Sequence, residues 1–148
     1  MKKVYIASPF FNEEQLERVK YIERLLKRYN IEYFSPRIDT RVKPDSTDEE
    51  RKRAFADNID AIKNCEYIIV VTDGKDIGTM FEAGFAYSID KPILYFAETL
   101  GNNPFNLMLA MSANAICKSR DELDCSLRHI NDCGFLSLIT AHYEGEIE

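Results

Sequence analysis

The sequence predicts an α/β fold: a flavodoxin-like, five-stranded parallel sheet in the order 2-1-3-4-5, with helices on both faces. Two observations predict it. Short apolar runs of strand length alternate along the chain with segments whose apolar residues recur at helical spacing. The chain also has 148 residues, which suffice for one core but not comfortably for two. We therefore expect a single domain over residues 1–148.

The first three elements follow one another closely. Residues 3–8 are an apolar run that Pro9 ends, which predicts the first strand. Asn12 is a typical helix cap, and apolar residues recur every three or four positions from there to about Tyr29, which predicts a helix. Residues 31–35 are expected to form a short second strand.

A loop and an acidic helix start come next. Residues 37–45 are polar and show no regular period, which predicts a loop. Ser46 or Thr47 caps a helix that runs to about Lys63, and the acidic residues of its first turn suit the helix dipole. The residues of this helix expected to face inward are Phe55, Ile59 and Ile62.

The second half of the chain continues the alternation. Residues 67–72 predict an apolar third strand, and a helix follows from around Gly78 to about Ser88. Residues 92–96 predict the fourth strand. The remaining elements are expected at residues 104–111 (helix), 115–118 (short fifth strand) and 120–131 (amphipathic helix).

The composition is that of an ordinary soluble enzyme domain. Hydrophobic residues make up 45% and charged residues 30%, which argues against disorder and against a membrane protein. No apolar run has transmembrane length, and the predicted first strand leaves no room for a signal peptide, so we expect a cytoplasmic protein. The formal net charge of −6 argues against nucleic acid as the main partner, because phosphate binding needs clustered cations.

Several common site motifs are absent from the sequence. Four cysteines form no CxxC pair and have no histidine cluster nearby, so we expect no metal site and mostly buried, reduced thiols. His129 and His142 are expected to be structural or surface residues. Neither a dinucleotide-binding G-x-G-x-x-G after the first strand nor a P-loop occurs, and no cofactor is expected.

The predicted strand order places a ligand crevice at the carboxyl ends of the first and third strands. Residues 5–10, Asn58 and residues 73–82 are expected to converge there. Among them, Asp76 and Glu82 are acids at the start of the helix that follows the third strand. Unpaired backbone N–H groups and the dipole at a helix start should favour the ionised form of Glu82.

An ionised Glu82 can attack a carbon that bears a leaving group, or stabilise a developing oxocarbenium ion. Gly78 allows a ligand to approach the backbone at the helix start. The alternative is that Glu82 is a solvated helix residue. The small neighbours Ala83, Gly84 and Ala86 argue against this alternative, because they let the helix pack tightly against the sheet or against a second subunit.

Four segments together resemble the nucleoside 2-deoxyribosyltransferases, in the expected order and over nearly the whole chain. They are the strand Val4-Tyr5-Ile6-Ala7-Ser8-Pro9-Phe10-Phe11, the Asn58-centred helix, the motif Asp76-x-Gly78-Thr79-x-x-Glu82-x-Gly84-x-Ala86, and Asn106-Leu107-Met108. The resemblance implies exchange of the base of 2′-deoxynucleosides with free nucleobases, through a covalent deoxyribosyl ester on Glu82. This is the double displacement of retaining glycosidases with a base in place of water.

The resemblance also implies roles for the other site residues. Tyr5 orients the nucleophile, and Asp76 binds the 5′-hydroxyl of the sugar. Asn106 and Met108 come from a neighbouring subunit, so the protein is expected to be a homo-oligomer built from dimers, such as a hexamer, with shared active sites. Phe10 is placed to pack against the base.

Two departures from the family's pattern leave base preference open. Asn58 stands where some members have an aspartate that protonates the base, and an amide cannot act as an acid. The loop at residues 35–41 offers no base-contacting glutamine, which some members carry there. The group that protonates the leaving base, and the contribution of the tail past Gly134, are equally open.

Two further hypotheses compete with base exchange. The first is an N-glycosidase that uses water as acceptor on 2′-deoxynucleosides or their 5′-monophosphates. A phosphate pocket usually needs arginine or several serines, and Ser8 alone supports this hypothesis weakly. The second is a nucleotide-sensing module without catalysis, which the intact set of Tyr5, Asp76 and Glu82 argues against.

Overall fold

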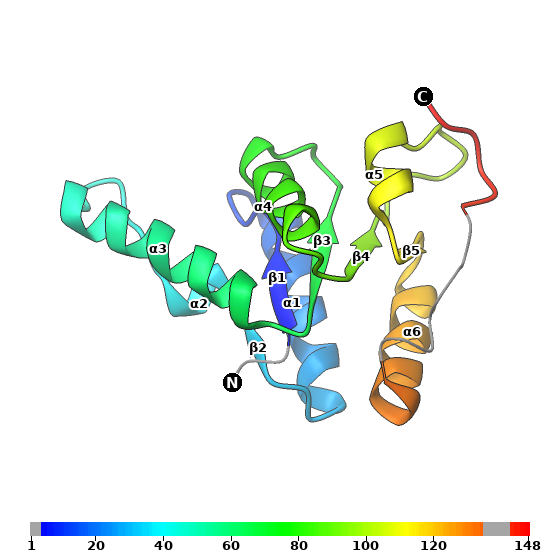
Figure 1. Cartoon of the computed structure of the whole chain (residues 1–148), viewed down its shortest axis with the longest axis horizontal. Coiled ribbons are helices and arrows are strands. Elements are labelled where there is room, and N and C mark those ends of the chain that lie inside the picture. Colours follow the sequence, from blue (N-terminus) through cyan, green and yellow to red (C-terminus); the bar gives the residue numbers. More distant parts are fainter. Residues whose placement is uncertain (1–3, 135–142) are drawn as a thin grey trace.

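The computed structural model describes residues 4–134 and 143–148 and has the predicted architecture. All strand pairings are parallel, and the sheet order is β2-β1-β3-β4-β5 (Figure 1). The order therefore reverses between β1 and β3, as expected, and open α/β sheets bind ligands at the carboxyl ends of such strands. The strands are β1 (Val4–Ala7), β2 (Tyr33–Phe34), β3 (Tyr67–Val71), β4 (Ile93–Phe96) and β5 (Ala115–Cys117).

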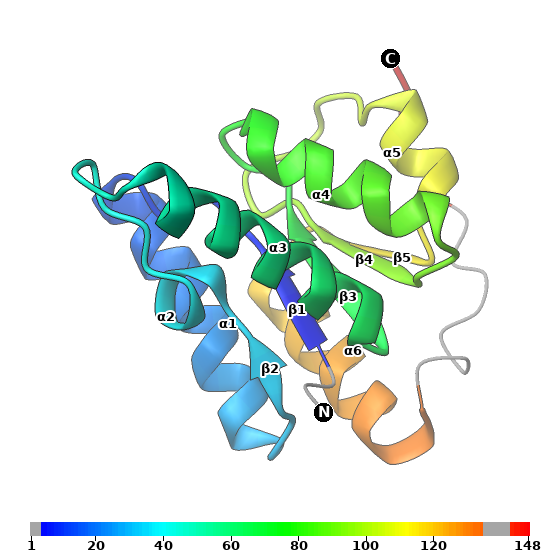
Figure 2. The same ribbon diagram turned by 60° about the vertical axis from the view of Figure 1, so that its left-hand side comes forward.

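Helices cover both faces of the sheet (Figure 2). On one face, α1 (Glu13–Arg28) and α6 (Arg120–Cys133) bury Val19, Ile22, Leu123 and Leu127 against alternate strand residues. On the other face lie α3 (Asp48–Asn64), α4 (Ile77–Ser88) and α5 (Leu107–Ser112). Ile62, Ala83, Ala86 and Ala110 are their buried contributions to a second core cluster, which also contains Tyr5.

Local sequence accounts for where the long helices begin. The side chain of Asn12 accepts a hydrogen bond from the backbone N–H of Gln15 at 2.8 Å, which caps α1 as predicted. Thr47, rather than Ser46, caps α3 and exchanges hydrogen bonds with Glu50 in a capping box. Both caps satisfy backbone donors that the first turn of a helix leaves unpaired.

The segment after the first helix differs from the prediction in two ways. The second strand has only the two residues of β2. The predicted loop begins with a helical turn, α2 (Pro36–Asp39), because Pro36 favours the first helical position and Asp39 accepts a hydrogen bond from the N–H of Ser35. A four-residue turn is too short to show a hydrophobic period, so the pattern could not reveal it.

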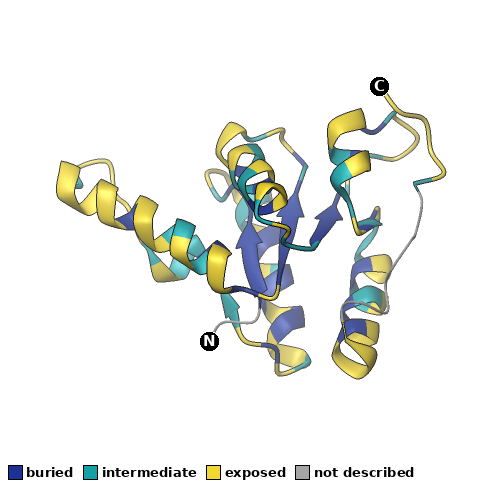
Figure 3. Ribbon diagram, in the orientation of Figure 1, coloured by how far each residue is buried: buried dark blue, intermediate teal, exposed yellow. Residues whose placement is uncertain are grey.

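The prediction that Phe55 faces inward is wrong. Helix α3 extends beyond the sheet edge and is mostly exposed (Figure 3), and Phe55 is 58% exposed. Its ring instead meets that of Phe81 on α4, with 6.1 Å between centroids. Of the three residues predicted to face inward, Ile62 is buried and Ile59 is half-buried.

Two of the four cysteines depart from the expected burial. Cys65 and Cys117 are buried, but Cys125 and Cys133 are exposed on α6, and all four are free thiols. His129 is exposed on the same helix, as expected, while Lys3 and His142 lie outside the described residues. Among the helices in the described part of the chain, none is long and apolar enough to cross a membrane.

Candidate active site

A hydrogen bond between Tyr5 and Glu82 joins β1 to α4 at the predicted crevice. The hydroxyl of Tyr5 donates to Oε1 of Glu82 at 2.6 Å, although the two residues are 77 positions apart in the chain. Tyr5 is fully buried, and its ring stacks on Phe34 of the neighbouring strand with 5.6 Å between centroids. The phenol is therefore held rigidly, and so is the carboxylate that it contacts.

Burial raises the pKa of Glu82 to about 7, and the charge of nearby Asp76 adds to the rise, while the hydrogen bond from Tyr5 opposes it. This corrects the expectation that the helix start holds the carboxylate ionised. Helix α4 begins at Ile77, so Glu82 lies beyond the first turn of the helix. The dipole acts most strongly within that first turn. Burial and the charge of Glu82 also raise the pKa of Tyr5, so the phenol stays protonated.

Asp76 is the cap of α4. Its Oδ2 accepts hydrogen bonds from the N–H of Thr79 at 2.8 Å and from the Thr79 hydroxyl at 2.9 Å. No hydrogen bond from the described residues reaches its other oxygen, Oδ1. A methyl group at Gly78 would lie 3.3 Å from Oδ2. Gly78 therefore makes room for the Asp76 cap. This is a packing reason for the glycine, in addition to the expected close approach of a ligand.

Asn58 interrupts the inward-facing stripe of α3. It lies one turn after buried Ala54 and one turn before buried Ile62. Its Oδ1 is buried without a hydrogen-bond partner among the described residues. A buried acceptor without a partner costs about 1–3 kcal/mol, and a ligand that donates a hydrogen bond would recover this energy. The oxygen is therefore a candidate ligand contact beside α4.

The structure separates Phe10 from the Tyr5–Glu82 pair. Phe10 is half-buried and packs against the core cluster of α1 and α6, on the other face of the sheet from Tyr5. Its ring is tilted against that of exposed Phe11, with 5.1 Å between centroids. The described contacts thus support a packing role for Phe10 rather than contact with the Glu82 carboxylate.

Asn106 and Met108 also lie apart from this pair within one chain. Asn106 caps α5, and its Oδ1 accepts hydrogen bonds from the N–H groups of Met108 and Leu109 at 3.0 and 3.3 Å. Met108 is 74% exposed. Among the polar and aromatic contacts of the described residues, neither residue contacts Tyr5 or Glu82.

A pocket of about 660 Å³ opens between two loops on the β4 side of α4. Thr72 to Lys75 form one wall, and Thr99 to Asn106 contribute to the other. Glu148 lines it too, because residues 146–148 pair with the backbone of Phe105 and Leu107. The last residues of the C-terminal tail therefore contribute to this pocket.

Sequence reasoning missed Phe34 as the residue that fixes the Tyr5 ring. The signal was present, because the predicted order places the second strand beside the first, and Tyr5 pairs with Phe34 in register. Among the described residues, no group of three or more His, Cys, Asp or Glu side chains is placed to hold a metal ion. The site therefore consists of a phenol, two carboxylates and an amide.

Comparison with solved structures extends the likeness beyond these residues. The 2-deoxyribosyltransferase of the bacterium Bacillus psychrosaccharolyticus is 29% identical, with a TM-score of 0.78 over 95% of this chain and 98% of that one. A CMP N-glycosidase of Clostridium botulinum is 21% identical, with a TM-score of 0.59 over 86% of this chain and 98% of that one. A conserved protein of Enterococcus faecalis is 16% identical, with a TM-score of 0.56 over 100% and 91%.

The last two likenesses show the fold alone, because their identity is low. No curated protein matches the chain by sequence. A model of the family described as nucleoside 2-deoxyribosyltransferase, however, matches residues 4–116, which include Tyr5, Asp76 and Glu82. The chain therefore belongs to the nucleoside 2-deoxyribosyltransferase family, whose members are glycosyl-transferring enzymes.

Proposed function

We propose that this protein exchanges the base of 2′-deoxynucleosides through a covalent deoxyribosyl ester on Glu82. The observation that carries the proposal is the 2.6 Å hydrogen bond from the buried Tyr5 hydroxyl to Glu82 at the point where the strand order reverses. The similarity to a bacterial 2-deoxyribosyltransferase over nearly both full chains supports it.

In the first step, the free Oε2 of ionised Glu82 attacks C1′ of the sugar. The new bond joins Oε2 to C1′, and the C1′–N bond breaks, so its electron pair leaves with the base. Tyr5 keeps its proton and donates to Oε1 throughout, which fixes the direction of attack. In the second step, a nitrogen of another base attacks C1′ from the vacated side, the C1′–Oε2 bond breaks, and the carboxylate is released. The attacking nitrogen loses its proton, which balances the proton that the departed base takes up.

The environment of Glu82 suits this chemistry. A carboxylate with a pKa of about 7 is partly ionised at neutral pH, and its weak solvation makes the anion reactive. Deoxyribose lacks the electron-withdrawing 2′-hydroxyl, so an oxocarbenium-like transition state forms more easily than on ribose. A single positioned carboxylate then suffices as nucleophile.

Three groups of this chain bind substrate in the proposal. Asp76 accepts a hydrogen bond from the 5′-hydroxyl through Oδ1, which the cap of α4 leaves available. Asn58 accepts a hydrogen bond from the base through its buried, unpartnered Oδ1. Gly78, which has no side chain, lets the sugar approach the backbone at the start of α4.

Asn106 and Met108 complete the site of a neighbouring subunit in a homo-oligomer built from dimers. Large apolar side chains on α4 and α5 support this arrangement, because they are exposed in the single chain and would be buried by a second copy. These residues are Ile77, Phe81, Tyr87, Leu107, Met108 and Met111. Gly84 has open space around its Cβ position, so a second copy can approach α4 closely there.

Hydrolysis of a nucleoside 5′-monophosphate finds less support. The hydroxyl of Ser8 is buried and donates to the carbonyl of Pro9. The guanidinium of Arg37 is held by Glu23, with Nη2 at 2.6 Å from Oε2. Neither group is therefore available for a phosphate, and Asp76 would repel one.

A base-exchange assay tests the proposal. The protein is mixed with thymidine and adenine, and the products are separated by chromatography. We expect deoxyadenosine and thymine in equal amounts without accumulation of free deoxyribose. Abundant free sugar, or release of base only from monophosphates, would favour the N-glycosidase instead. Tight nucleoside binding without any turnover would exclude both enzymes. A panel of purine and pyrimidine donors then defines the base preference.

A further inference from the structure

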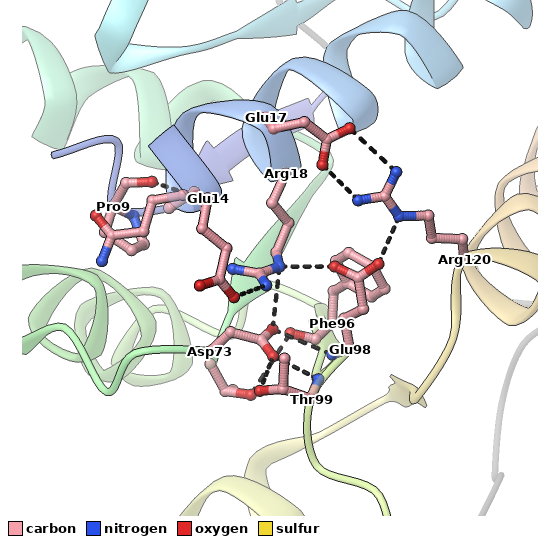
Figure 4. Close-up of polar contacts among 12 residues, drawn as sticks. Pro9, Glu14, Glu17, Arg18, Asp73, Phe96, Glu98, Thr99 and Arg120 are labelled. Carbon is pink, nitrogen blue, oxygen red and sulfur yellow. Dashed lines mark hydrogen bonds and ion pairs between the residues drawn. The ribbon is translucent and has the colours of Figure 1, made fainter. Parts of the chain in front are cut away.

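A buried polar network lies at the base of the 660 Å³ pocket, on the side of the sheet away from Glu82. It joins α1, the loops after β3 and β4, and the start of α6 (Figure 4). Its centre is Asp73, which directly follows the third strand's exit and is 5% exposed. None of the roles assigned above to Tyr5, Asp76 or Glu82 uses this network.

Asp73 binds the facing wall of the pocket through three donors. Its Oδ1 accepts hydrogen bonds from the N–H of Thr99 at 2.6 Å and from the Thr99 hydroxyl at 2.5 Å. Its Oδ2 accepts one from the N–H of Glu98 at 3.1 Å. Asp73 and Thr99 lie on opposite walls, so this carboxylate connects the two loops between which the pocket opens.

Arg18 supplies the positive charge behind the carboxylate. Its side chain is 5% exposed, and its Nε lies 3.9 Å from Oδ2 of Asp73 and 2.8 Å from Oε2 of Glu98. Nη2 of Arg18 donates to Glu14 at 2.8 Å. Burying a carboxylate costs several kcal/mol unless a cation and hydrogen bonds compensate it, and Arg18 supplies such a cation beside Asp73.

The two loops that Asp73 connects carry different parts of the proposed site. The loop after β3 leads directly to Asp76 and α4, and the loop after β4 leads to Asn106 and Met108. In the proposed oligomer the first loop serves this chain's own site and the second serves the neighbouring subunit's site. A shift between the two loops therefore displaces one wall of every site and weakens substrate binding. Asp73 sets this spacing without contact to Tyr5 or Glu82 among the described hydrogen bonds.

We propose that Asp73, backed by Arg18, is a positioning residue that fixes the Asn106-bearing loop relative to the Asp76-bearing loop and thereby sets affinity for the deoxynucleoside. The inference rests on the proposed function, because it concerns how the sugar-binding walls are held. Asp73 affects the bound substrate and the transition state alike, so its loss raises KM and leaves kcat nearly unchanged.

Asp73→Asn is the main test. Asparagine has the same size but offers only one acceptor oxygen to the three donors of Thr99 and Glu98. Its NH2 group would face a backbone N–H group, and two donors cannot bond each other. We expect KM for thymidine to rise roughly tenfold, with kcat within about threefold of wild type. Thr99→Val removes only the hydroxyl donor and should raise KM less. If Asp73→Asn does not fold, this milder variant decides the question.

Tyr29→Phe is the matched control for lost stability. The Tyr29 hydroxyl donates to the Asp124 carboxylate between α1 and α6, away from the pocket. This variant loses a charge-assisted hydrogen bond, so it should be less stable with an unchanged KM. An unchanged KM in both Asp73→Asn and Thr99→Val, with lowered stability alone, would overturn the positioning role.

Amide hydrogen exchange separates this inference from the proposed function. Leu100 and Asn103 donate hydrogen bonds within the loop after β4, to the carbonyls of Ala97 and Leu100. Their exchange should be faster in Asp73→Asn and Thr99→Val than in wild type or Tyr29→Phe. If wild type turns over no nucleoside, the proposed function fails, while equal exchange in all four proteins refutes the loop connection itself.

Discussion

Glu82 and Glu98 are two carboxylates at the same edge of the sheet with opposite electrostatic outcomes. Burial raises the pKa of both. For Glu82 the rise prevails, and the pKa reaches about 7. For Glu98, hydrogen bonds from Arg120 and Arg18 outweigh burial, and the pKa lies below its usual value. Depth and neighbours both contribute to the difference, since Glu82 is the more deeply buried carboxyl and faces the neutral Tyr5 hydroxyl and the acidic Asp76, whereas two guanidinium groups bind Glu98.

The comparison distinguishes an acid that stabilises the fold from an acid that is placed to react. Glu98 is neutralised by cations on two helices, so it stabilises the packing of α1 against α6 and the sheet. No arginine or lysine among the described residues forms an ion pair with Glu82. An acid that the fold buries without a cation costs stability, and such acids are characteristic of functional sites.

Glu82→Gln should have the largest effect on activity. The amide keeps the size of the side chain and can accept the Tyr5 hydrogen bond, but it cannot form the ester. We expect base exchange to fall at least about a thousandfold, as when a covalent nucleophile is removed. The assay is the transfer of deoxyribose from thymidine to adenine. A residual rate above a tenth of wild type would falsify the role of Glu82 as nucleophile.

The same variant should be more stable than wild type at alkaline pH. The folded pKa of Glu82, about 7, is above its ordinary value of 4.5, so folding disfavours the anion. The stability of wild type is therefore full below pH 4.5 and falls as pH rises through 7, by on the order of 3 kcal/mol. In urea unfolding at pH 8.5, Glu82→Gln should have a higher free energy of unfolding than wild type. This difference in stability should shrink toward pH 4.5.

Tyr5→Phe should have the second-largest effect on activity. Loss of the phenol leaves the carboxylate less well oriented, so we expect kcat/KM to fall roughly 10- to 100-fold. Because the Tyr5 hydrogen bond lowers the pKa of Glu82, the acidic limb of the pH–rate profile should move to higher pH. A limb that stays near pH 7 in the variant would show that another group controls it.

Asp76→Asn should shift the acidic limb of the pH–rate profile to lower pH. The charge of Asp76 raises the pKa of Glu82, so the amide should lower this pKa and extend activity to more acidic pH. Asparagine is also a good helix cap, so α4 should persist. We expect KM for the nucleoside to rise roughly tenfold from the weaker contact with the 5′-hydroxyl. Circular dichroism and a pH–rate profile check the two expectations.

Sequence patterns sufficed for the sheet order and for the convergence of the segments that carry Tyr5 and Glu82, while the pairing of these two residues came from the family resemblance. Alternating strands and helices leave few topologies for a parallel sheet, and the reversal between β1 and β3 brings distant residues together. The short helix α2 and the exposure of Phe55 escaped prediction for a common reason. Both features depend on how far the chain extends beyond the edge of the sheet. The hydrophobic period of a segment carries no information about its position relative to that edge.

The electrostatics of the site could not be predicted from sequence either. Spacing placed Glu82 near a helix start, where its charge would be favoured, but burial dominates in the structure and reverses the expectation. The partners of Asp73 were equally hidden, because Arg18 is 55 positions earlier and Thr99 is 26 positions later. Such pairings depend on tertiary packing, which adds charge neighbours that no local motif contains.

Glu98→Gln should have the smallest effect on activity and should change stability instead. Its pKa is lowered in the fold, so its stabilisation is present above the ordinary value of 4.5 and is lost as pH falls below it. We expect a loss of roughly 1–3 kcal/mol at pH 7 that disappears in acid, measured by urea unfolding. Asp73 keeps its three donors in this variant, so transfer per folded molecule should stay within about twofold of wild type. Glu82→Gln should gain stability and lose activity under the same conditions, and if both variants changed alike, the distinction between the two acids would be wrong.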